Sequence, residues 1–459
     1  MHVLHAIHDF LPRHRAGSEI YVQDLARTQL GRHHVTVLCG EYDPGRPHGH
    51  VAWRVHDSVP VVEVVNNWVV ASFEDTYRPP LIARRLDHLL QTLRPDVVHV
   101  HNLLNLSFDL PALAKARGIP VVATLHDYTL VCPSGGQRIH RQEEHLCREI
   151  DPSRCVRCFP RSPFHAQMSF AALTARLPRP GVSRRAAKTI GRFLPGLARR
   201  AQRLVGQTMA PALRTADVEA RLDAARRLLT AIDLVVAPSR AMAREFVALG
   251  LPPERIDVSD YGFTRLPASP RPSRAGLLRI GFVGTLVWHK GPHVLLQAAR
   301  QLPADTFEIR IFGSTDTFPA YTADLRRLAS GLPVRFMGAF DRQDVPGVYA
   351  DLDVLVVPSL WLENSPLVIH EACMAGVPVV GARIGGIPDL VTGGENGLLY
   401  DASSPASLAD ALRRLIDDPA LVASFAARLP RVKAIEDDAA EWDARYRQVT
   451  TGIRLETVS

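Results

Sequence analysis

The sequence predicts an α/β protein made of two doubly wound, Rossmann-like domains. Short apolar, β-branched runs alternate with helix-length amphipathic stretches along all 459 residues. Continuous apolar runs of this kind are typical of parallel strands that are covered by helices on both faces. The runs fall into two sets, which fit two sheets better than one very wide sheet.

The predicted strands are separated by segments long enough for helices, as βαβ units require. In the N-terminal half they cover residues 2–8, 34–39, 59–65, 96–101, 120–126 and 233–238. In the C-terminal half they cover residues 279–284, 307–312, 334–337, 353–358, 377–382 and 397–400.

A proline- and serine-rich stretch at residues 267–273 is typical of a linker between the two sets. We therefore predict an N-terminal domain over residues 1–267, with a cysteine-containing and basic insertion at about 129–216. The C-terminal domain is predicted over residues 274–430, and a last amphipathic helix over residues 431–459.

Basic residues are concentrated in one segment. Residues 152–216 contain 13 Lys or Arg and no Asp or Glu, while the whole chain has a net charge of +7, so the remainder has a net charge of −6. The stretch 184–205 is basic and amphipathic, which is typical of a helix on an anionic membrane surface. The alternative is a helical cap packed on the domain. A nucleic-acid arm is disfavoured because no recognised binding module accompanies the segment.

The first residues have neither a basic region nor a long apolar core, so they indicate a strand and not a signal peptide. No stretch approaches the roughly 20 apolar residues that span a bilayer. We expect a cytoplasmic protein, with peripheral association at the cytoplasmic face of the membrane as the role of the basic segment.

Ligands of open parallel sheets bind beyond the carboxyl ends of the strands, which makes the loops there the candidate sites. After the strand 353–358, Glu363 lies in the loop and Glu371 lies in the following helix. We predict Ser365 as the N-cap and Pro366 as the first helical residue. A helix start suits a diphosphate, a loop carboxylate suits sugar hydroxyls, and Glu371 suits the two hydroxyls of a ribose. The alternative is two solvated surface carboxylates.

A second loop of the same domain complements these carboxylates. The strand 279–284 ends at Gly284, and Lys290 precedes another helix, where it neutralises phosphate charge without a metal. Gly313 and the pair Gly385 and Gly386 follow other strands and allow close backbone approach. A solvated lysine and simple turns are the alternatives.

In the N-terminal domain, Gly17 lies in a loop of small residues between the first strand and a helix predicted over residues 20–30. His126 ends the strand 120–126 and is a candidate for positioning the reacting groups. His99, His101 and Asn102, at the end of the preceding strand, are candidates for the acceptor side.

Four cysteines cluster in the insertion, and only one pair has Cys-x2-Cys spacing. They are Cys132, Cys147, Cys155 and Cys158. A cytoplasmic protein seldom carries structural disulfides, so two interpretations stand beside each other: one structural zinc site, or unligated thiols.

Taken together, these motifs resemble the large retaining glycosyltransferase family 4. The resemblance rests on the Glu363–x7–Glu371 spacing, the Pro-Ser-x-Trp-x-Glu-Asn-x-Pro context around Glu363, and the Gly-x-Leu-x3-Lys-Gly segment from Gly284. It covers nearly the whole chain apart from the basic segment. It implies a GT-B fold, a nucleoside-diphosphate sugar donor and transfer with retention at the anomeric carbon, without a cofactor. It also implies that the last helix returns to the first domain.

The resemblance assigns roles to residues of both domains. His126, Glu363 and Lys290 would be catalytic, with Glu363 on the donor sugar and Lys290 on the diphosphate. Donor binding would involve Gly17, Gly284, Thr285, Lys290, Gly313, Glu363, Asn364, Ser365, Pro366, Leu367 and Glu371. Many family members have an arginine where this chain has Thr285, which shifts phosphate binding toward Lys290 or another basic residue.

The predicted function is therefore transfer of a sugar from a nucleoside-diphosphate sugar to an acceptor hydroxyl. If the basic segment binds membranes, the acceptor is a lipid-linked or growing surface glycan. The alternatives are a GT-B sugar-nucleotide epimerase and a non-catalytic nucleotide-sugar or membrane-binding protein. A nicotinamide-dependent oxidoreductase is disfavoured, because no strand is followed by a convincing G-x-G-x-x-G.

Overall fold

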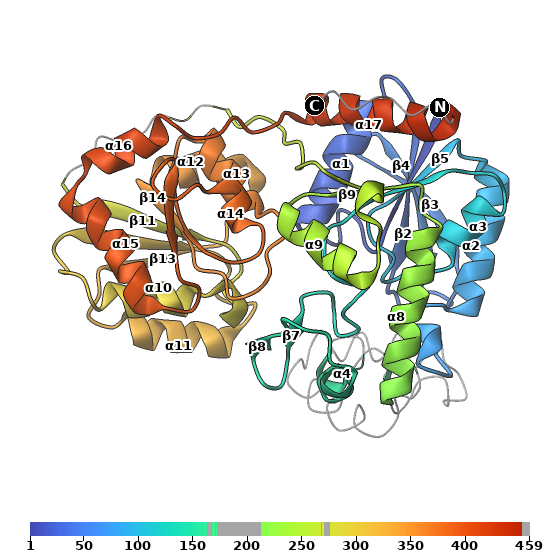
Figure 1. Ribbon diagram of the computed structural model, residues 1–459, viewed down its shortest axis with the longest axis horizontal. Helices are drawn as coiled ribbons and strands as arrows, with labels where there is room; N and C mark the ends of the chain where they lie inside the picture. Colours follow the sequence, from blue (N-terminus) through green and yellow to red (C-terminus); the bar gives the residue numbers. More distant parts are fainter. Residues whose placement is uncertain are drawn as a thin grey trace. The chain divides into compact units, whose positions relative to one another are not determined.

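The computed structural model of the chain contains two compact units, each built around its own sheet (Figure 1). The structure describes residues 1–162, 165, 168–169, 171, 213–267, 269 and 276–451. The first unit contains Met1–Pro238, Ala243–Ser259 and the C-terminal segment from Ile435. The second unit contains Ser239–Met242 and Asp260–Ala434.

The sheet of the first unit has eight strands in the order β10-β9-β6-β5-β1-β2-β4-β3. All neighbouring strands pair parallel except β3, which pairs antiparallel with β4 at the edge. The strands are β1 (His2–Ile7), β2 (His34–Glu41), β3 (Val51–His56), β4 (Val59–Val65), β5 (Val97–Val100), β6 (Val121–Thr124), β9 (Leu234–Ala237) and β10 (Ile256–Val258). The side chains of β5, β6 and β9 are all buried, as expected for central parallel strands.

The helices that lie wholly or mainly in the first unit connect these strands. They are α1 (Gly17–Gln29), α2 (Pro80–Leu93), α3 (Leu110–Lys115), α4 (Pro152–Cys158), α8 (Thr215–Thr230), α9 (Arg240–Leu249) and α17 (Ile435–Thr451). Short 3₁₀ turns add η1 (Glu74–Thr76), η2 (Phe159–Arg161) and η3 (Pro253–Arg255).

The C-terminal helix α17 packs against α1 in the first unit (Figure 1). Trp442 Nε1 donates to Tyr21 Oη at 3.0 Å, and Tyr21 Oη donates to Asp438 Oδ2 at 2.7 Å. Trp442 and Tyr446 are almost fully buried. Aromatic burial and satisfied hydroxyls therefore fix α17 to this unit.

The sheet of the second unit has six parallel strands in the order β13-β12-β11-β14-β15-β16. In chain order this is 3-2-1-4-5-6, the order of the Rossmann fold. The strands are β11 (Leu278–Val283), β12 (Phe307–Phe312), β13 (Val334–Gly338), β14 (Val354–Val357), β15 (Val379–Ala382) and β16 (Gly397–Tyr400).

Helices again separate the strands of the second unit. They are η4 (Trp288–Lys290), α10 (Pro292–Ala299), α11 (Pro319–Ala329), η5 (Arg342–Asp344), α12 (Val345–Ala350), α13 (Leu367–Met374), α14 (Ile387–Leu390), α15 (Pro405–Asp417) and α16 (Ala420–Ala426). The core between them and the sheet consists of buried aliphatic and aromatic side chains, among which Leu295, Phe307 and Leu412 are fully buried.

The predicted fold class is confirmed, and each of the twelve predicted apolar runs contains a strand. The strands β3 and β10 were not predicted. In β3 the side chains of Trp53 and Val55 are 57% and 69% exposed, because an edge strand is covered less completely. Such a strand lacks the continuous apolar run that marks a central one. The two-residue strands β7 (Ile139–His140) and β8 (His145–Leu146) are too short for any periodicity to show.

The long segment of the second unit begins at Asp260, whereas the C-terminal domain was predicted to start at residue 274. Residues that precede the proline-rich stretch already bond to this unit. Ser365 Oγ donates to Asp260 Oδ1 at 2.7 Å, and Asn364 Nδ2 donates to Tyr261 Oη at 3.4 Å. The proline-rich stretch therefore lies within the sequence range of the second unit, and the boundary between the units precedes it.

The stretch 184–205, for which membrane binding was predicted, lies outside the described residues. In the parts of the chain that the structure describes, no helix has the length and apolarity needed to cross a bilayer.

Candidate functional site

The strand order of the second unit reverses between β11 and β14, which are neighbours in the sheet. The loops after these two strands contain Lys290 and Glu363, respectively. Because a crevice opens where consecutive connections leave in opposite directions, this switch point is the expected ligand site of a doubly wound sheet. The structure thus brings together two loops that are separated by 73 positions in the sequence.

Lys290 and Glu363 form an ion pair at this point. Lys290 Nζ donates to Glu363 Oε1 at 2.8 Å, and Nζ also lies 5.0 Å from the centre of the Trp361 ring. The Lys290 side chain is 31% exposed, whereas the Glu363 side chain is 3% exposed. A buried carboxylate and an accessible ammonium group therefore share one site.

Glycine holds the two loops in this arrangement. Gly291 has a φ of +73°, and a Cβ at this position would collide with the carbonyl oxygen of Pro358 at the end of β14. Leu360 N–H also donates to His289 O at 2.8 Å. Close backbone packing, which only glycine permits here, places Lys290 over the loop that contains Glu363.

The Glu363 carboxylate is further held by its own loop. Ser359 Oγ donates to Glu363 Oε1 at 2.6 Å, and Gly386 N–H donates to the Glu363 carbonyl oxygen at 2.7 Å. Both side-chain hydrogen bonds use Oε1, so within the described chain Oε2 remains available to a further donor. Gly385 and Gly386 were predicted as points of close approach, and their neighbour is the backbone of Glu363 and Asn364.

Helix α13 starts beside Glu363, but its first turn differs from the prediction. The helix begins at Leu367, with Pro366 as the N-cap and no side-chain cap. Ser365 was predicted as the cap. Its hydroxyl instead donates to Asp260 and lies 2.8 Å from His370 Nε2. The first backbone N–H groups of α13 are thus left without a side-chain acceptor, which is the property of an anion site.

Glu371 lies in the second turn of α13 and is separate from the Lys290–Glu363 pair. Tyr349 Oη donates to Glu371 Oε2 at 2.8 Å. Burial raises the pKa of the Glu371 carboxyl, while the Tyr349 hydrogen bond and the Arg342 charge act in the opposite direction. Tyr349 and Arg342 were not predicted, because neither lies in a recognisable motif.

The remaining predicted donor residues follow β11 and β12. Gly284 N–H donates to Phe312 O at 3.0 Å, and a Cβ at Gly313 would collide with the Gly284 carbonyl oxygen. These two glycines therefore pack against each other at the ends of neighbouring strands. The side chain of Thr285 is exposed.

Gly17 and His126 belong to the first unit. Helix α1 begins at Gly17, earlier than the predicted start at residue 20, because Glu19 Oε2 accepts a hydrogen bond from Ala16 N–H at 2.9 Å and stabilises an earlier first turn. His8 Nε2 lies 3.3 Å from Glu19 Oε1, which links the end of β1 to the same turn.

His126 is the outer member of a chain of buried histidines. Its Nε2 lies 3.0 Å from His101 Nδ1, and His101 Nε2 lies 3.0 Å from His5 Nδ1. His5 Nε2 lies 2.9 Å from Gln29 Oε1. Burial lowers the pKa of His5 to about 4 and that of His126 to about 3, and it lowers the pKa of His101 as well. The rings are therefore neutral near pH 7.

Because the rings are neutral, the hydrogen bonds that link these histidines all run in one direction. With Gln29 Oε1 as an acceptor, His5 donates through Nε2, so its Nδ1 accepts from His101 Nε2–H. By the same reasoning His101 Nδ1 accepts from His126 Nε2–H. The tautomer of His126 is thereby fixed with its proton on Nε2 and a lone pair on Nδ1. Gln29 Nε2 donates onward to Tyr446 Oη at 3.4 Å.

His99, which was predicted for the acceptor side, lies in the interior of the first unit. It lies within β5, is fully buried, and contacts Thr124 Oγ1 at 2.8 Å and Tyr446 Oη at 2.7 Å. Its ring also packs against Trp442, with 4.0 Å between ring centroids. Asn102 is buried too, and its Nδ2 donates to Asp127 Oδ2 at 2.6 Å. His99 and His101 are two positions apart and their rings lie side by side, with 4.0 Å between the centroids, so they differ in their hydrogen-bond partners and not in the face of the sheet.

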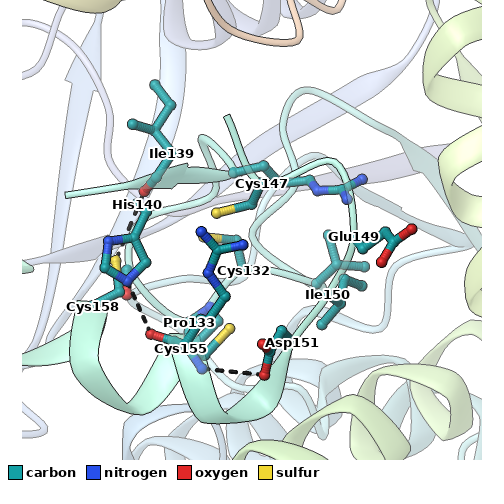
Figure 2. A pocket seen from close by; sticks show the side chains of 14 residues that line it. Cys132, Pro133, Ile139, His140, Cys147, Glu149, Ile150, Asp151, Cys155 and Cys158 are labelled. Atoms are coloured by element: carbon teal, nitrogen blue, oxygen red, sulfur yellow. Dashed lines mark hydrogen bonds between the residues drawn. The ribbon is translucent and has the colours of Figure 1, made fainter. Parts of the chain in front are cut away.

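The four clustered cysteines of the first unit surround a single cavity of about 30 Å³ (Figure 2). Cys132, Cys147 and Cys155 are half-buried, and Cys158 is buried. The structure therefore unites all four residues of the predicted metal set.

Two family models match separate parts of the chain. Residues 15–158 match the model described as Glycosyltransferase Family 4, and residues 278–418 match the model described as Glycosyl transferases group 1. Together they cover more than half of the chain.

Curated relatives match over shorter lengths. A D-inositol 3-phosphate glycosyltransferase of Corynebacterium diphtheriae is 40% identical over 147 residues, which are 30% of this chain and 34% of that protein. A protein of the same name from Nocardioides sp. is 28% identical over 270 residues, which are 52% of this chain and 59% of that protein. The chain thus spans about a third to three fifths of the length of these relatives.

Solved structures match over nearly the full length. Sucrose-phosphate synthase from Thermosynechococcus elongatus has a TM-score of 0.64 at 17% identity, covering 98% of this chain and 100% of that chain. Anabaena HepE in complex with UDP has a TM-score of 0.58 at 17% identity, covering 98% of each chain. At these identities the likeness concerns the fold.

Two doubly wound units, one of them with charged side chains at its switch point, define a GT-B fold of the glycosyltransferase type. The two matching family models identify the family within this fold. The chain belongs to glycosyltransferase family 4, the group 1 glycosyl transferases, which is a family of transferase enzymes.

Proposed function

We propose that this chain is a retaining glycosyltransferase that moves a sugar from a nucleoside-diphosphate sugar to an acceptor hydroxyl. The observation that carries the proposal is the Lys290–Glu363 ion pair at the switch point, beside the uncapped start of α13. An ammonium group and free N–H groups suit a diphosphate, and a buried carboxylate with an available oxygen suits sugar hydroxyls.

In this proposal, donor binding gives Lys290 and Glu363 new hydrogen-bond partners. The diphosphate accepts from Lys290 and from the first N–H groups of α13, while Glu363 Oε2 accepts from a hydroxyl of the donor sugar. As the bond between the anomeric carbon and the phosphate oxygen breaks, negative charge develops on the leaving diphosphate. Lys290 and the helix start stabilise that charge, so we expect turnover without an added divalent cation.

Retention is proposed to follow front-face attack by the acceptor hydroxyl. Among the described residues, no second carboxylate hydrogen bonds to Lys290 or Glu363, and Glu371 is bonded to Tyr349. This favours a single displacement over a double displacement through a glycosyl-enzyme. His126, with its Nδ1 lone pair, is proposed to position the reacting groups, a role that rests on the family resemblance.

Two acceptor classes are proposed for testing. The names of the curated relatives suggest a phosphorylated cyclitol such as D-inositol 3-phosphate. The basic segment suggests instead a lipid-linked or growing glycan and a peripheral position on an anionic membrane. Flotation with anionic and neutral liposomes distinguishes membrane binding from its absence.

The decisive experiment is a panel of nucleotide sugars, beginning with UDP-sugars because UDP is bound in a protein of similar fold. Binding and slow donor hydrolysis are measured without acceptor, and transfer is then measured with each acceptor class. We expect one donor to bind and to hydrolyse slowly, and its transfer product to retain the anomeric configuration. Donor binding without any turnover would overturn the enzyme proposal, and acceptor-independent epimerisation would identify an epimerase.

Glu371→Gln is expected to weaken donor binding more than it slows the chemical step. A hydrogen bond to a charged group contributes about 1.5–3 kcal/mol, so the donor KM should rise by roughly 10- to 100-fold. Tyr349→Phe, which removes the hydroxyl that holds Glu371, should raise KM by less. Nucleoside diphosphate affinity, measured by calorimetry, should fall in parallel with KM. A large loss of kcat at unchanged affinity would contradict the ribose role.

A further inference from the structure

The segment that follows β6 is a small substructure with four cysteines directed at one cavity (Figure 2). Cys132 follows a turn in which its N–H donates to Tyr128 O at 2.8 Å. Cys147 directly follows β8 of the β7–β8 hairpin, and its N–H donates to Arg138 O at 2.8 Å. Cys155 and Cys158 belong to α4.

Local sequence signals explain why these cysteines converge. Asp151 caps α4 by accepting from Ser153 N–H and Arg154 N–H, which fixes where the helix begins. Residues three apart lie on one face of a helix, so Cys155 and Cys158 face the hairpin together. The hairpin then returns the chain from Cys132 to Cys147, so that positions 15 apart meet at the same cavity.

This substructure has little apolar core of its own. Among its described residues from 129 to 162, the buried apolar side chains are Val131, Pro133, Ile139, Cys158 and Phe159. Its regular elements are two strands of two residues, one helix of seven residues and one 3₁₀ turn of three residues. A segment of this size and composition usually requires disulfides or a metal to stay folded. All four cysteines are free thiols in the structure.

Near the cysteines lies a buried arginine, Arg221, whose charge is also felt by Asp127. Arg221 is 4% exposed, donates to the Leu130 carbonyl oxygen at 3.0 Å, and forms no ion pair with a carboxylate in the described chain. Cys132 and Cys155 are among the groups whose negative charge would act on it. A buried guanidinium needs a negative partner, and neutral thiols supply none.

One backbone donor lies beside a sulfur atom of the cluster. Arg141 N–H lies 3.3 Å from Cys158 Sγ, an arrangement that stabilises a thiolate. Ser134 lines the same cavity with its hydroxyl buried and without a hydrogen-bond partner among the described residues. As a thiol, Cys158 Sγ donates to the Ile139 carbonyl oxygen at 3.8 Å, and its deprotonation on binding a metal would leave Arg141 N–H as its hydrogen-bond partner.

We propose that Cys132, Cys147, Cys155 and Cys158 bind one Zn²⁺ ion as a structural tetrathiolate site. Each of the four thiols releases one proton to solvent, and the site with its ion then has a net charge of −2, which gives the buried Arg221 a negative neighbour. Four thiolates in a tetrahedron are the ligand set of structural zinc and leave no position for a substrate. The site therefore folds this segment and takes no part in the transfer.

The sulfurs surround the cavity more widely than a finished zinc site. In the described chain, the groups of three ligands within 4.8 Å of one another are His5, His99, His101 and, separately, His140, Glu143, His145. Binding of the ion requires the thiols to move inward, which a cysteine does by rotation about χ1.

The two histidine groups are poorer sites. In the second group Glu143 Oε2 accepts from Arg154 Nη2 at 3.0 Å, so a cation is already present. The histidines of the first group are engaged in their own hydrogen-bond chain.

The first test is metal analysis of the full chain, purified without added metal. Elemental analysis should find about one zinc per chain, and the four thiols should react with a thiol reagent only after a strong chelator is added. Replacement by Co²⁺ should give the visible absorption of tetrahedral cobalt thiolate. A metal-free chain with four reactive thiols, a pair of disulfides in the mass spectrum, or an iron–sulfur chromophore would each overturn the proposal.

Matched cysteine variants make the test specific. Cys155→Ser should lower the zinc content several-fold, whereas Cys373→Ser, in the second unit, should leave it unchanged. If Cys155→Ser does not fold, limited proteolysis of the wild-type protein replaces it. Chelation should then open cleavage sites between residues 129 and 162 while the second unit stays resistant, and an unchanged cleavage pattern would contradict a structural role.

Discussion

Glu363→Gln is expected to fold like the wild-type protein and to lose roughly 10²-fold of its donor turnover. A hydrogen bond to a charged group contributes about 1.5–3 kcal/mol, and a tenfold change in rate corresponds to about 1.4 kcal/mol. The amide keeps the size of the side chain and still accepts from Ser359 Oγ. Lys290 loses its partner, but at 31% exposure its ammonium group is hydrated, so the cost in stability is about 0–1 kcal/mol.

Lys290→Met is expected to behave differently. It leaves the Glu363 carboxylate, which is 3% exposed, without a counter-charge. Breaking a buried pair by removing one partner costs about 3–5 kcal/mol, and because the Lys290 side of this pair is partly open to solvent, we expect a cost toward the lower end. This variant should lose both stability and turnover.

The double variant separates the two effects. Lys290→Met with Glu363→Gln has neither charge, so it should regain most of the stability that Lys290→Met loses and still be inactive. Thermal unfolding and donor hydrolysis are measured on the wild type, both single variants and the double variant. Full turnover by Glu363→Gln, or stability effects that simply add, would contradict the proposed pair.

This pair could be predicted because its signals are local. A buried strand, a loop with a carboxylate and a helix start follow one another within the residues 353–374, and the lysine follows the strand 279–284 in the same manner. Parallel sheet geometry then brings the ends of such strands together. Ser359, which holds Glu363, escaped prediction because its partner is visible only in the folded loop.

The error at Ser365 has a long-range cause. The residue has the right type and position for an N-cap, yet its hydroxyl is bonded to Asp260, 105 positions earlier. A local propensity loses to a partner that the chain delivers from another element. The cysteines show the reverse case, because unequal spacings indicated little until the hairpin and α4 placed all four around one cavity.

The hydrogen bonds that link the histidines could not be predicted from the sequence, for a different reason. His5 lies in a strand, Gln29 in a helix and Tyr446 in the last helix, and each replaces an apolar residue at a buried position. Periodicity reports that such a position is internal and not what it bonds to. Only His126 and His101, at the ends of predicted strands, were accessible to the argument from strand ends.

His101→Phe is expected to reduce kcat, because it removes the acceptor that fixes the proton of His126 on Nε2. His99→Phe is the matched control, since His99 lies in β5, which His101 directly follows, is also buried, and is bonded to Thr124 and Tyr446 and not to His126. Both variants leave a buried polar group without a partner and should lose about 1–3 kcal/mol of stability. Only His101→Phe should lower kcat for donor turnover, and equal kcat in the two variants would contradict the positioning role.

The buried histidines also make the stability of the first unit sensitive to acid. An unfolded histidine has a pKa of about 6.5, whereas burial lowers the pKa of His5 to about 4 and that of His126 to about 3. Below pH 6.5 the unfolded state therefore binds more protons than the folded state, and stability falls as the pH drops toward 4. By about pH 5 the loss should be on the order of 1–2 kcal/mol for each such histidine.

The variants isolate this contribution. Burial raises the pKa of Asp9 and Asp127, and these groups act in the opposite sense, so the pH dependence of the wild type alone is a sum. The difference between the wild type and each histidine variant removes them. Urea unfolding of the first unit, followed at about pH 7.5 and about pH 5, should show a smaller loss in His101→Phe and in His99→Phe than in the wild type. An equal loss in all three would mean that these rings are already charged in the folded protein. That result would also contradict the fixed tautomer of His126, which requires neutral rings.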